Sequence, residues 1–212
     1  MNLFAINNAQ FAISGNKIII DCGNVDPKTL FHSKIEVGTL NPGDTFFQNG
    51  EKFIVLDKKH NGEVFVIKAD FLDDRHEFGE NNDWRVSPIR ASMNSGEIYQ
   101  HMCELFGAEN IIDMHRDLTS LDGLDDYGTC IDKVSMLSAS EYAKYHKILG
   151  VASEYECQWL TVTAFSTPSN NYVTFICCVG SNGVLYLNAC EVIYAVRPVL
   201  TISSSTLVDT EE

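Results

Sequence analysis

Two Asn-Gly pairs, Asn49-Gly50 and Asn61-Gly62, most restrict what this chain can fold into, because they separate three short segments of strand-like composition. Asn-Gly tolerates the positive φ angles that a tight type I′ turn requires. The segments that flank these turns are residues 45–48, 52–56 and 64–69. The pattern therefore predicts an antiparallel three-stranded meander over residues 45–69.

A hairpin is predicted before this meander, and helices followed by strands are predicted after it. Residues 11–14 and 17–20 flank Gly15-Asn16, a two-residue turn signal. One helix is expected from Ser87-Pro88 to about Gly107, and a second from a capping box at Ser138 to about Lys147. Closing strands are predicted at residues 159–165, 172–179, 184–188 and 192–196, and Pro198 is expected to end the last ladder or lie at its edge. This order predicts an α+β fold with two helices and twisted antiparallel sheets.

The charge of the chain excludes several classes of partner. The 212 residues carry a formal net charge of −14, with 15 Lys+Arg against 29 Asp+Glu. Such a surface repels nucleic-acid phosphates and anionic lipid, so we expect no nucleic-acid partner and no membrane insertion. The apolar runs are too short to span a bilayer, and residues 1–10 lack the features of a signal peptide. Seven cysteines without a C-x-x-C pair predict reduced thiols and synthesis in a reducing compartment.

Motifs for catalysis or cofactor binding are sparse. The six histidines form no H-E-x-x-H pattern, and the sequence has no phosphate-binding loop, dinucleotide fingerprint or nucleophile elbow. We therefore expect no catalytic residues, no cofactor and no metal. The cysteines leave one alternative open, because Cys177 or Cys178 with Cys157 or Cys190 offers soft-metal ligands. The favoured interpretation is that these cysteines are small core residues.

The acidic stretch from residue 117 to residue 132 has two interpretations. Asp117, Asp122, Asp125 and Asp126 offer hard oxygen ligands of the kind that calcium prefers. Their spacing does not match an EF-hand, which favours a solvated loop. Both interpretations stay open at the level of sequence.

Four sequence blocks carry a resemblance to a known family. They are WRVSPIRASMN (residues 84–94), DLTSLDG (117–123) followed by Tyr127-Gly128, KVSMLS (133–138) followed by Glu141-Tyr142 and Tyr145, and a closing set of Trp159-Leu160, Ser166-Thr167-Pro168, Gly183 and Ala195-Val196-Arg197-Pro198. In this order they resemble an uncharacterised domain family common in phages and prophages of Gram-positive bacteria. That family is similar to C-type-lectin-like domains, the fold shared by formylglycine-generating enzymes and hypervariable phage receptor-binding proteins. The chain departs from the family at Gln158, where a second Trp is common, and at Ala195, where Gly is common.

The resemblance implies a division of the chain. A C-type-lectin-like domain is expected over residues 43–204, preceded by an N-terminal β-rich attachment segment, residues 1–42, and followed by a loose polar tail, residues 205–212. It also implies a structural role for Arg197, which we expect to anchor the last strand through a buried hydrogen-bonded pair. The calcium-binding triplets of sugar-binding lectins are absent from the sequence, which argues against calcium-dependent sugar binding.

The function implied by the resemblance is that of a bacteriophage virion structural protein. Capsid decoration, a head fibre or a tail-associated adhesin are the expected roles, with synthesis in the host cytoplasm and localisation in the virion. Residues 1–42 are expected to bind other virion proteins, and the chain is expected to be a homo-oligomer. Two alternatives remain open: a copper-dependent enzyme of the formylglycine-generating type, and a prophage-encoded ligand-binding module.

A ligand-binding surface is predicted on loops late in the chain. These loops are rich in Ser, Asn, Gly and Tyr, a composition that adaptable recognition surfaces share with ordinary turns. The acidic charge favours a neutral or cationic partner, such as a host-surface glycan or protein. The predicted ligand-binding residues are Ser166, Thr167, Ser169, Asn170, Asn171, Tyr172, Ser181, Asn182, Tyr186 and Asn188.

Overall fold

The computed structural model describes residues 3–6, 9–14, 17–21, 34–149 and 158–211. The chain divides into two compact units, Met1–Lys34 and Ile35–Thr210. The boundary between the two units therefore falls at Lys34, whereas the sequence analysis placed it at residue 42. The reason is that β4 (Ile35–Glu36) pairs with β18 (Leu207–Val208), which joins the first residues after Lys34 to the compact C-terminal unit.

The N-terminal unit is an antiparallel three-stranded sheet. Its strands β1 (Leu3–Ile6), β2 (Ala9–Ser14) and β3 (Lys17–Asp21) follow one another in space as they do in sequence. The predicted hairpin of residues 11–14 with residues 17–20 is confirmed as the β2–β3 pair. Its turn, Gly15-Asn16, lies outside the described residues.

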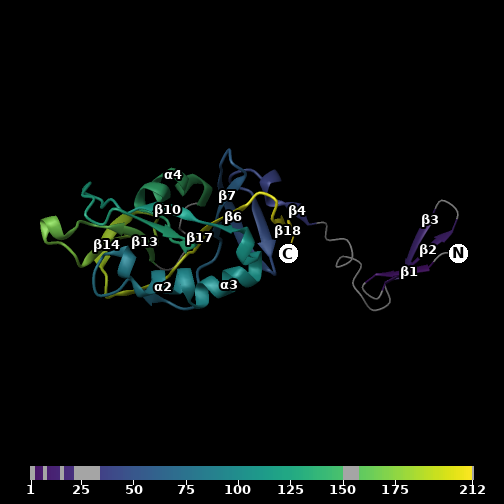
Figure 1. Ribbon diagram of the computed structural model, residues 1–212, viewed down its shortest axis with the longest axis horizontal. Helices are drawn as coiled ribbons and strands as arrows, with labels where there is room; N and C mark the ends of the chain where they lie inside the picture. Colours follow the sequence, from purple (N-terminus) through teal and green to yellow (C-terminus); the bar gives the residue numbers. More distant parts are fainter. Residues whose placement is uncertain (1–2, 7–8, 15–16, 22–33, 150–157, 212) are drawn as a thin grey trace. The chain divides into compact units, whose positions relative to one another are not determined.

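A six-stranded antiparallel sheet forms the centre of the second unit, which we call the compact unit (Figure 1). The predicted meander is confirmed within it, and Asn49 and Gly50 have the positive φ angles, 51° and 83°, that its first turn requires. The spatial order is β12-β17-β7-β6-β5, and β9 also pairs with β17. These strands are β5 (Thr45–Gln48), β6 (Glu51–Lys58), β7 (Glu63–Lys68), β9 (Ile111–Ile112), β12 (Val134–Ser135) and β17 (Val199–Ser203).

Helices cover both faces of this sheet. Alternate residues of β7 pack against different helices. Val64 and Val66 belong to the core cluster that contains the buried residues of α2 (Pro88–Ser95) and α3 (Glu97–Phe106). Phe65 and Ile67 belong to a second cluster, which contains Tyr142, Tyr145 and Leu149 of α4 (Ala139–Leu149). Successive residues of a strand face opposite sides of the sheet, so both sides of β7 are buried. The first predicted helix is thus two helices, separated at the extended residue Gly96.

A second antiparallel sheet lies at one end of the compact unit. It consists of β13 (Trp159–Ala164), β14 (Phe175–Val179) and β15 (Leu185–Ala189), with β14 in the middle. Two short pairs complete the strands: β8 (His76–Glu77) with β16 (Ile193–Tyr194), and β10 (Met114–Asp117) with β11 (Thr129–Asp132). Short 3₁₀ helices are η1 (Val37–Thr39), η2 (Trp84–Val86), η3 (Ala108–Asn110) and η5 (Pro168–Asn170). The protein is therefore an α+β structure built mostly from antiparallel strands.

Two predictions about the C-terminal part need correction. Pro198 does not end the last ladder, because it directly precedes β17, a strand with neighbours on both sides. Proline is tolerated at the start of a strand, and the carbonyl of Pro198 still accepts a hydrogen bond from the backbone N–H of Lys68 at 3.0 Å. The segment predicted as a loose tail, residues 205–212, contains a strand, because β18 pairs with β4 and Val208 is fully buried.

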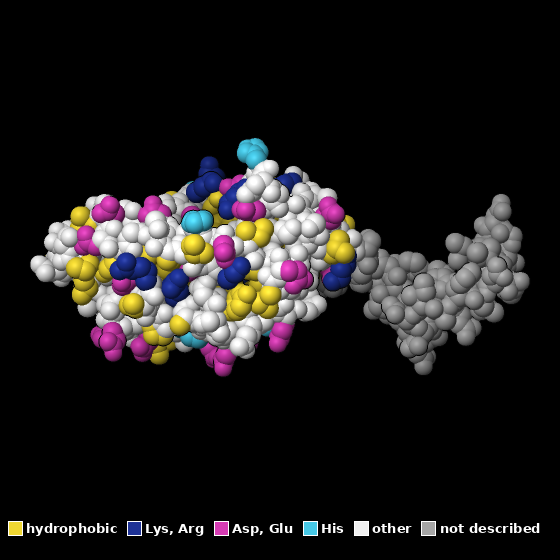
Figure 2. Space-filling view, viewed as in Figure 1, with side chains coloured by type: hydrophobic (Ala, Val, Ile, Leu, Met, Phe, Trp, Pro, Cys, Tyr) yellow, Lys and Arg dark blue, Asp and Glu magenta, His cyan; other side chains and the backbone are white. Residues whose placement is uncertain are grey.

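The surface of the compact unit is acidic and mixed. Figure 2 shows Asp and Glu side chains spread over the visible face of this unit, with Lys and Arg side chains between them. Within the described residues, none of the helices is both long and apolar enough to cross a membrane.

Candidate functional site

The predicted recognition segment, residues 166–172, follows β13 and is held by the acidic loop, residues 118–128, which joins β10 to β11. Asp122 provides the first anchor. Its Oδ2 accepts hydrogen bonds from Ser166 Oγ at 2.6 Å and from Asn170 Nδ2 at 3.0 Å. Its other oxygen accepts from Ser120 Oγ within the acidic loop. One carboxylate thus links two loops that are distant in sequence.

Asp126 provides the second anchor. Thr167 Oγ1 donates to Asp126 Oδ2 at 2.7 Å, and the backbone N–H of Ser169 donates to the same oxygen at 2.9 Å. Ser169 Oγ donates to Asp126 Oδ1 at 2.9 Å. Both oxygens of this carboxylate are therefore used to fix the 166–172 loop.

These hydrogen bonds favour the charged form of both aspartates. The pKa of Asp122 is lowered, first by the hydrogen bond from Ser120 and then by that from Ser166. The pKa of Asp126 is lowered, first by the hydrogen bond from Thr167 and then by those from Ser169. Both groups are consequently ionised acceptors at neutral pH.

A buried amide supports the same loop from inside. Asn82 is fully buried, and its Nδ2 donates to the carbonyl oxygens of Ser166 at 3.0 Å, Tyr172 at 3.1 Å and Phe175 at 2.9 Å. Its Oδ1 accepts a hydrogen bond from the hydroxyl of Tyr127 in the acidic loop. Asn82 therefore joins the two loops to each other. Sequence reasoning missed it, because a single asparagine outside any motif gives no signal.

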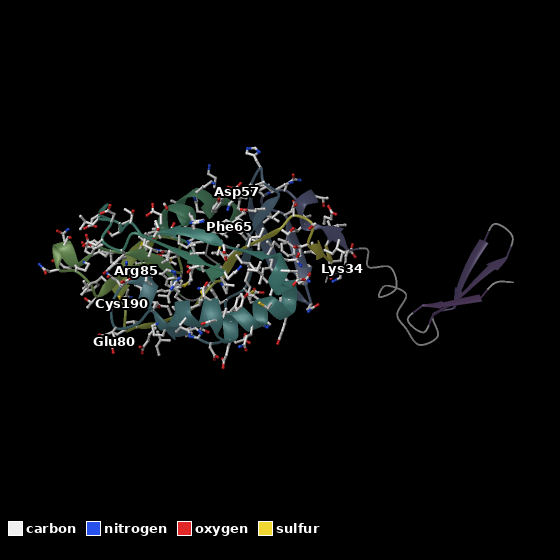
Figure 3. All side chains as sticks on the ribbon, in the orientation of Figure 1. Lys34, Asp57, Phe65, Glu80, Arg85 and Cys190 are labelled. Carbon is white, nitrogen blue, oxygen red and sulfur yellow. The ribbon has the colours of Figure 1, made fainter. Side chains whose placement is uncertain are left out.

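The sequence block that begins at Trp84, residues 84–94, also helps to hold these loops in place. Trp84 Nε1 donates to Asp132 Oδ2 at 2.7 Å, and Arg90 Nε donates to Asp132 Oδ1 at 2.7 Å. Arg85, labelled in Figure 3, lies with its guanidinium carbon 5.4 Å from the ring centre of Tyr127. These contacts join η2 and α2 to β11 and to the acidic loop. The residues that carry the family resemblance thus hold the loop framework together.

The predicted ligand-binding residues of the 166–172 loop differ in accessibility. Ser166 and Thr167 are buried, and with Ser169 and Asn170 they are bound to the aspartates. Asn171 is exposed and has a left-handed backbone, with φ at 59°. The side chain of Tyr172 is 53% exposed, and its ring meets that of Phe165 edge-on, with 5.8 Å between centres. Of the predicted residues in this loop, Asn171 and Tyr172 are therefore exposed and lie outside the hydrogen bonds to the two aspartates.

The remaining predicted residues do not join this group. Ser181 and Asn182 lie in the turn after β14, whereas Tyr172 lies before β14, so the strand separates them by its whole length. Asn182 Oδ1 accepts a hydrogen bond from the backbone N–H of Val184. Tyr186 packs against the main core, and Asn188 Oδ1 accepts from the backbone N–H of Ala189. The structure thus brings together residues 166–172 and leaves the other four predicted residues elsewhere.

The metal alternatives can be examined among the described residues. No group of three or more His, Cys, Asp or Glu side chains suited to a metal ion occurs in that part of the chain. In the acidic loop, Asp122 and Asp126 bind the neighbouring loop, and Asp117 Oδ1 accepts from the N–H and hydroxyl of Thr119. The acidic stretch is therefore more than a solvated loop, since its carboxylates hold protein groups.

Burial holds the thiols of Cys177, Cys178 and Cys190 in their protonated form in the metal-free protein. Burial raises the pKa of Cys177 to about 11 and that of Cys190 to about 12. Burial also raises the pKa of Cys178, and adjacent residues of a strand face opposite ways, so Cys177 and Cys178 do not converge. Cys157 lies outside the described residues.

Arg197, which was predicted to anchor the last strand, lies just before β17. It is fully buried, and its Nε donates to the backbone carbonyl of Lys68 at 2.8 Å. Its guanidinium carbon lies 5.9 Å from the ring centre of Trp159. The described acceptor is thus a backbone carbonyl, which ties the segment before β17 to the end of β7.

Comparison with known proteins adds no identification: no family model matches the chain, and neither a curated protein nor a solved structure matches it.

Proposed function

We propose that this chain is a bacteriophage virion structural protein that attaches through its N-terminal unit and displays a binding loop on its compact unit. One observation carries the proposal. The compact unit begins at β4, and β4 with β18 lies at the end opposite to β13 and β14 (Figure 1). The 166–172 loop, which joins β13 to β14, is therefore remote from the point of attachment. This arrangement suits a domain that is anchored at one end and presents its other end.

The distribution of charge supports separate roles for the two units. Residues 1–34 contain Lys17, Lys28 and Lys34 against Asp21 and Asp26, a net charge of +1. The remaining residues therefore carry 12 Lys+Arg against 27 Asp+Glu, a net charge of −15. An acidic unit keeps displayed copies apart and soluble, whereas a nearly neutral unit can bind a neighbour without strong repulsion.

The geometry of the loop supports binding in preference to catalysis. Its buried hydroxyls donate to aspartates, so they serve the shape of the loop and not a reaction. A loop fixed by two carboxylates and one buried amide is preorganised, which lowers the entropy lost on binding. We propose a C-type-lectin-like classification for the compact unit, on the strength of the sequence resemblance and the antiparallel, helix-flanked architecture.

The proposed contact residues are Asn171 and Tyr172, and the proposed ligand is a neutral or cationic group on the host surface, such as a glycan or a protein. An exposed tyrosine ring beside an amide offers apolar area and hydrogen bonds at low entropic cost. The test is adsorption to host cells of the double variant Asn171→Gly with Tyr172→Ala. Glycine keeps the left-handed backbone at residue 171, so the loop conformation is preserved.

We expect this double variant to lose most cell binding while its unfolding midpoint stays close to that of the parent. His60→Ala is the matched control, because His60 is an exposed residue in the turn between β6 and β7. Adsorption of the double variant equal to that of His60→Ala would exclude the loop as the binding site.

The attachment role of residues 1–34 is tested by measuring whether a truncated chain is incorporated into phage particles. A version that begins at Ile35 retains β4 and its pairing with β18, whereas a cut near residue 43 would remove the buried Val37 and destabilise the compact unit. We expect the version from Ile35 to stay folded and to be missing from purified particles. Normal incorporation of this version would show that residues 1–34 are not the attachment module.

A further inference from the structure

A row of paired residues in the central sheet forms the floor of a cavity of about 240 Å³, with α4 and β10 as its walls. Asp57 pairs with Phe65, and Phe65 pairs with Thr201, so these three residues form one row across β6, β7 and β17. Directly paired residues share a face of the sheet, and on this face the ring centre of Phe65 lies 6.0 Å from that of Tyr145 in α4. Figure 3 labels Asp57 and Phe65, two residues of this floor.

Two buried side chains that line this cavity each have a polar atom without a partner. Arg116 is 5% exposed, and Thr201 is fully buried. The terminal nitrogens of Arg116 donate to the carboxylate of Glu141 at 2.8 and 2.6 Å and to the backbone carbonyl of Met136 at 2.8 Å. Within the described residues, however, Arg116 Nε and Thr201 Oγ1 have no hydrogen-bond partner. Buried donors are costly to leave unbonded, so two of them in one cavity point to an oxygen acceptor that occupies it.

The carboxylates in the walls of the cavity are already used as acceptors. Both oxygens of Asp57 accept hydrogen bonds, and Oδ2 does so from Lys144 Nζ at 2.7 Å and from the hydroxyl of Tyr145 at 2.8 Å. Both oxygens of Glu141 accept from Arg116. Donors therefore remain in the lining after its acceptors have been taken, and a matching ligand supplies acceptors.

Charge and size restrict this ligand further. The lining contains three basic side chains and two acidic ones, a net charge of +1 with His115 neutral: Lys59, Arg116 and Lys144 against Asp57 and Glu141. Lys59 also bonds Glu63 at 2.9 Å, so the cavity is at most weakly positive, but it lacks the acidic excess of the compact unit around it. A volume of about 240 Å³ lies below the usual range for drug-sized ligands, and Phe65 and Met114 add apolar surface to the lining.

We propose that this cavity binds a small aliphatic carboxylate. Its oxygens accept hydrogen bonds from Arg116 Nε and the hydroxyl of Thr201, and its short apolar part contacts Phe65 and Met114. A charged acceptor suits this place because hydrogen bonds to a carboxylate are stronger than those to a neutral oxygen. The site shares no residue with the 166–172 loop and does not rest on the proposed function.

The test is an NMR titration of the ¹⁵N-labelled full chain at pH ~7 and constant ionic strength, with the Arg116 Nε–H signal as the reporter. The probes are butyrate, its uncharged analogue butyramide, and the cation butylammonium. We expect a saturable shift with butyrate and a dissociation constant on the order of 1 mM, as befits a ligand of so few atoms, within a titration to ~50 mM. Butyramide should bind more weakly, and butylammonium should leave the signal unchanged.

Thr201→Val removes the proposed hydroxyl donor, and Thr206→Val is its matched control. Thr206 Oγ1 is also buried without a partner among the described residues, but Thr206 does not line this cavity. Neither substitution removes a hydrogen bond of the folded chain, so both variants should stay folded. Thr201→Val should weaken butyrate binding about tenfold or more, whereas Thr206→Val should leave it unchanged.

Three results would overturn the proposal. The first is the absence of a saturable shift in the parent chain, which would mean that the cavity holds water only. The second is equal affinity for butyrate in Thr201→Val and in the parent. The third is binding of butyramide or butylammonium as tight as that of butyrate, which would exclude a site selective for carboxylates.

Discussion

Replacement of Asn82 by alanine should destabilise the compact unit more than any other single change in the loop framework. The variant removes the donor to three carbonyl oxygens and the acceptor of the Tyr127 hydroxyl, all from a fully buried position. The carbonyls of Ser166 and Tyr172 and the hydroxyl of Tyr127 lose this partner, at about 1 kcal/mol each, whereas the Phe175 carbonyl still accepts from the backbone N–H of Phe165. With some relaxation of the loop, we expect the free energy of unfolding to fall by about 2–3 kcal/mol.

Urea denaturation followed by tryptophan fluorescence measures this loss. Asn171→Gly is the control, because it removes an amide from the loop that Asn82 supports, but at an exposed position and with a preserved backbone. The control should change the free energy of unfolding by no more than about 0.5 kcal/mol. A loss below about 1 kcal/mol for Asn82→Ala would refute the reasoning, because it would mean that water satisfies these groups as well as the amide does.

Three further predictions follow from the same framework. Trp84→Phe removes the hydrogen bond to the buried carboxylate of Asp132, and should lower the free energy of unfolding by about 2 kcal/mol in the same denaturation assay; an unchanged midpoint would contradict it. Since hydrogen bonds lower the pKa of Asp126 below its ordinary value of 3.8, its contribution to stability is present above pH 3.8 and is lost as the pH falls through the lowered pKa. An NMR titration of the Ser169 amide should accordingly show its transition below pH 3.8, and a transition above that value would be inconsistent with the anchor. Burial raises the pKa of Cys177 to about 11 and of Cys190 to about 12, so neither thiol should react with iodoacetamide at pH ~8 in the native protein, whereas mass mapping should find both alkylated after unfolding.

The local turn chemistry of the meander could be predicted, but only in part. At Asn49-Gly50 both residues have positive φ, as the sequence predicts. At Asn61-Gly62 only Gly62 does, with φ at 82°, and its N–H bonds to the carbonyl of Lys59. The same dipeptide therefore forms a different turn, because β6 continues to Lys58 and the loop is longer. Strand length depends on pairing partners, which a dipeptide does not encode.

The central strand β17 was missed for a related reason. Its residues from Val199 to Ile202 are all buried, so the segment lacks the alternation that identifies a half-exposed strand. Its partners β7, β9 and β12 are far away in sequence, and nothing local indicates that they meet there. Pro198 then favoured the end of a ladder, although proline is equally compatible with its start.

The candidate site also depends on contacts between segments that are far apart in sequence, which the sequence did not reveal. Composition correctly marked residues 166–172 as a polar loop, but it gave no indication that Asp122 and Asp126 would bind its hydroxyls. Paired carboxylates on a loop resemble calcium ligands in sequence, and only the fold reveals that serine and threonine occupy them. Asn82 joins these loops without belonging to any recognisable motif.

Cryo-electron microscopy of particles released from the lysed host tests the account most directly. The account predicts density for this chain at repeated positions on the particle, with β4 and β18 toward the particle and the 166–172 loop pointing outward. Particles in which every density belongs to other proteins, together with recovery of this chain from the soluble fraction of the lysate, would contradict it.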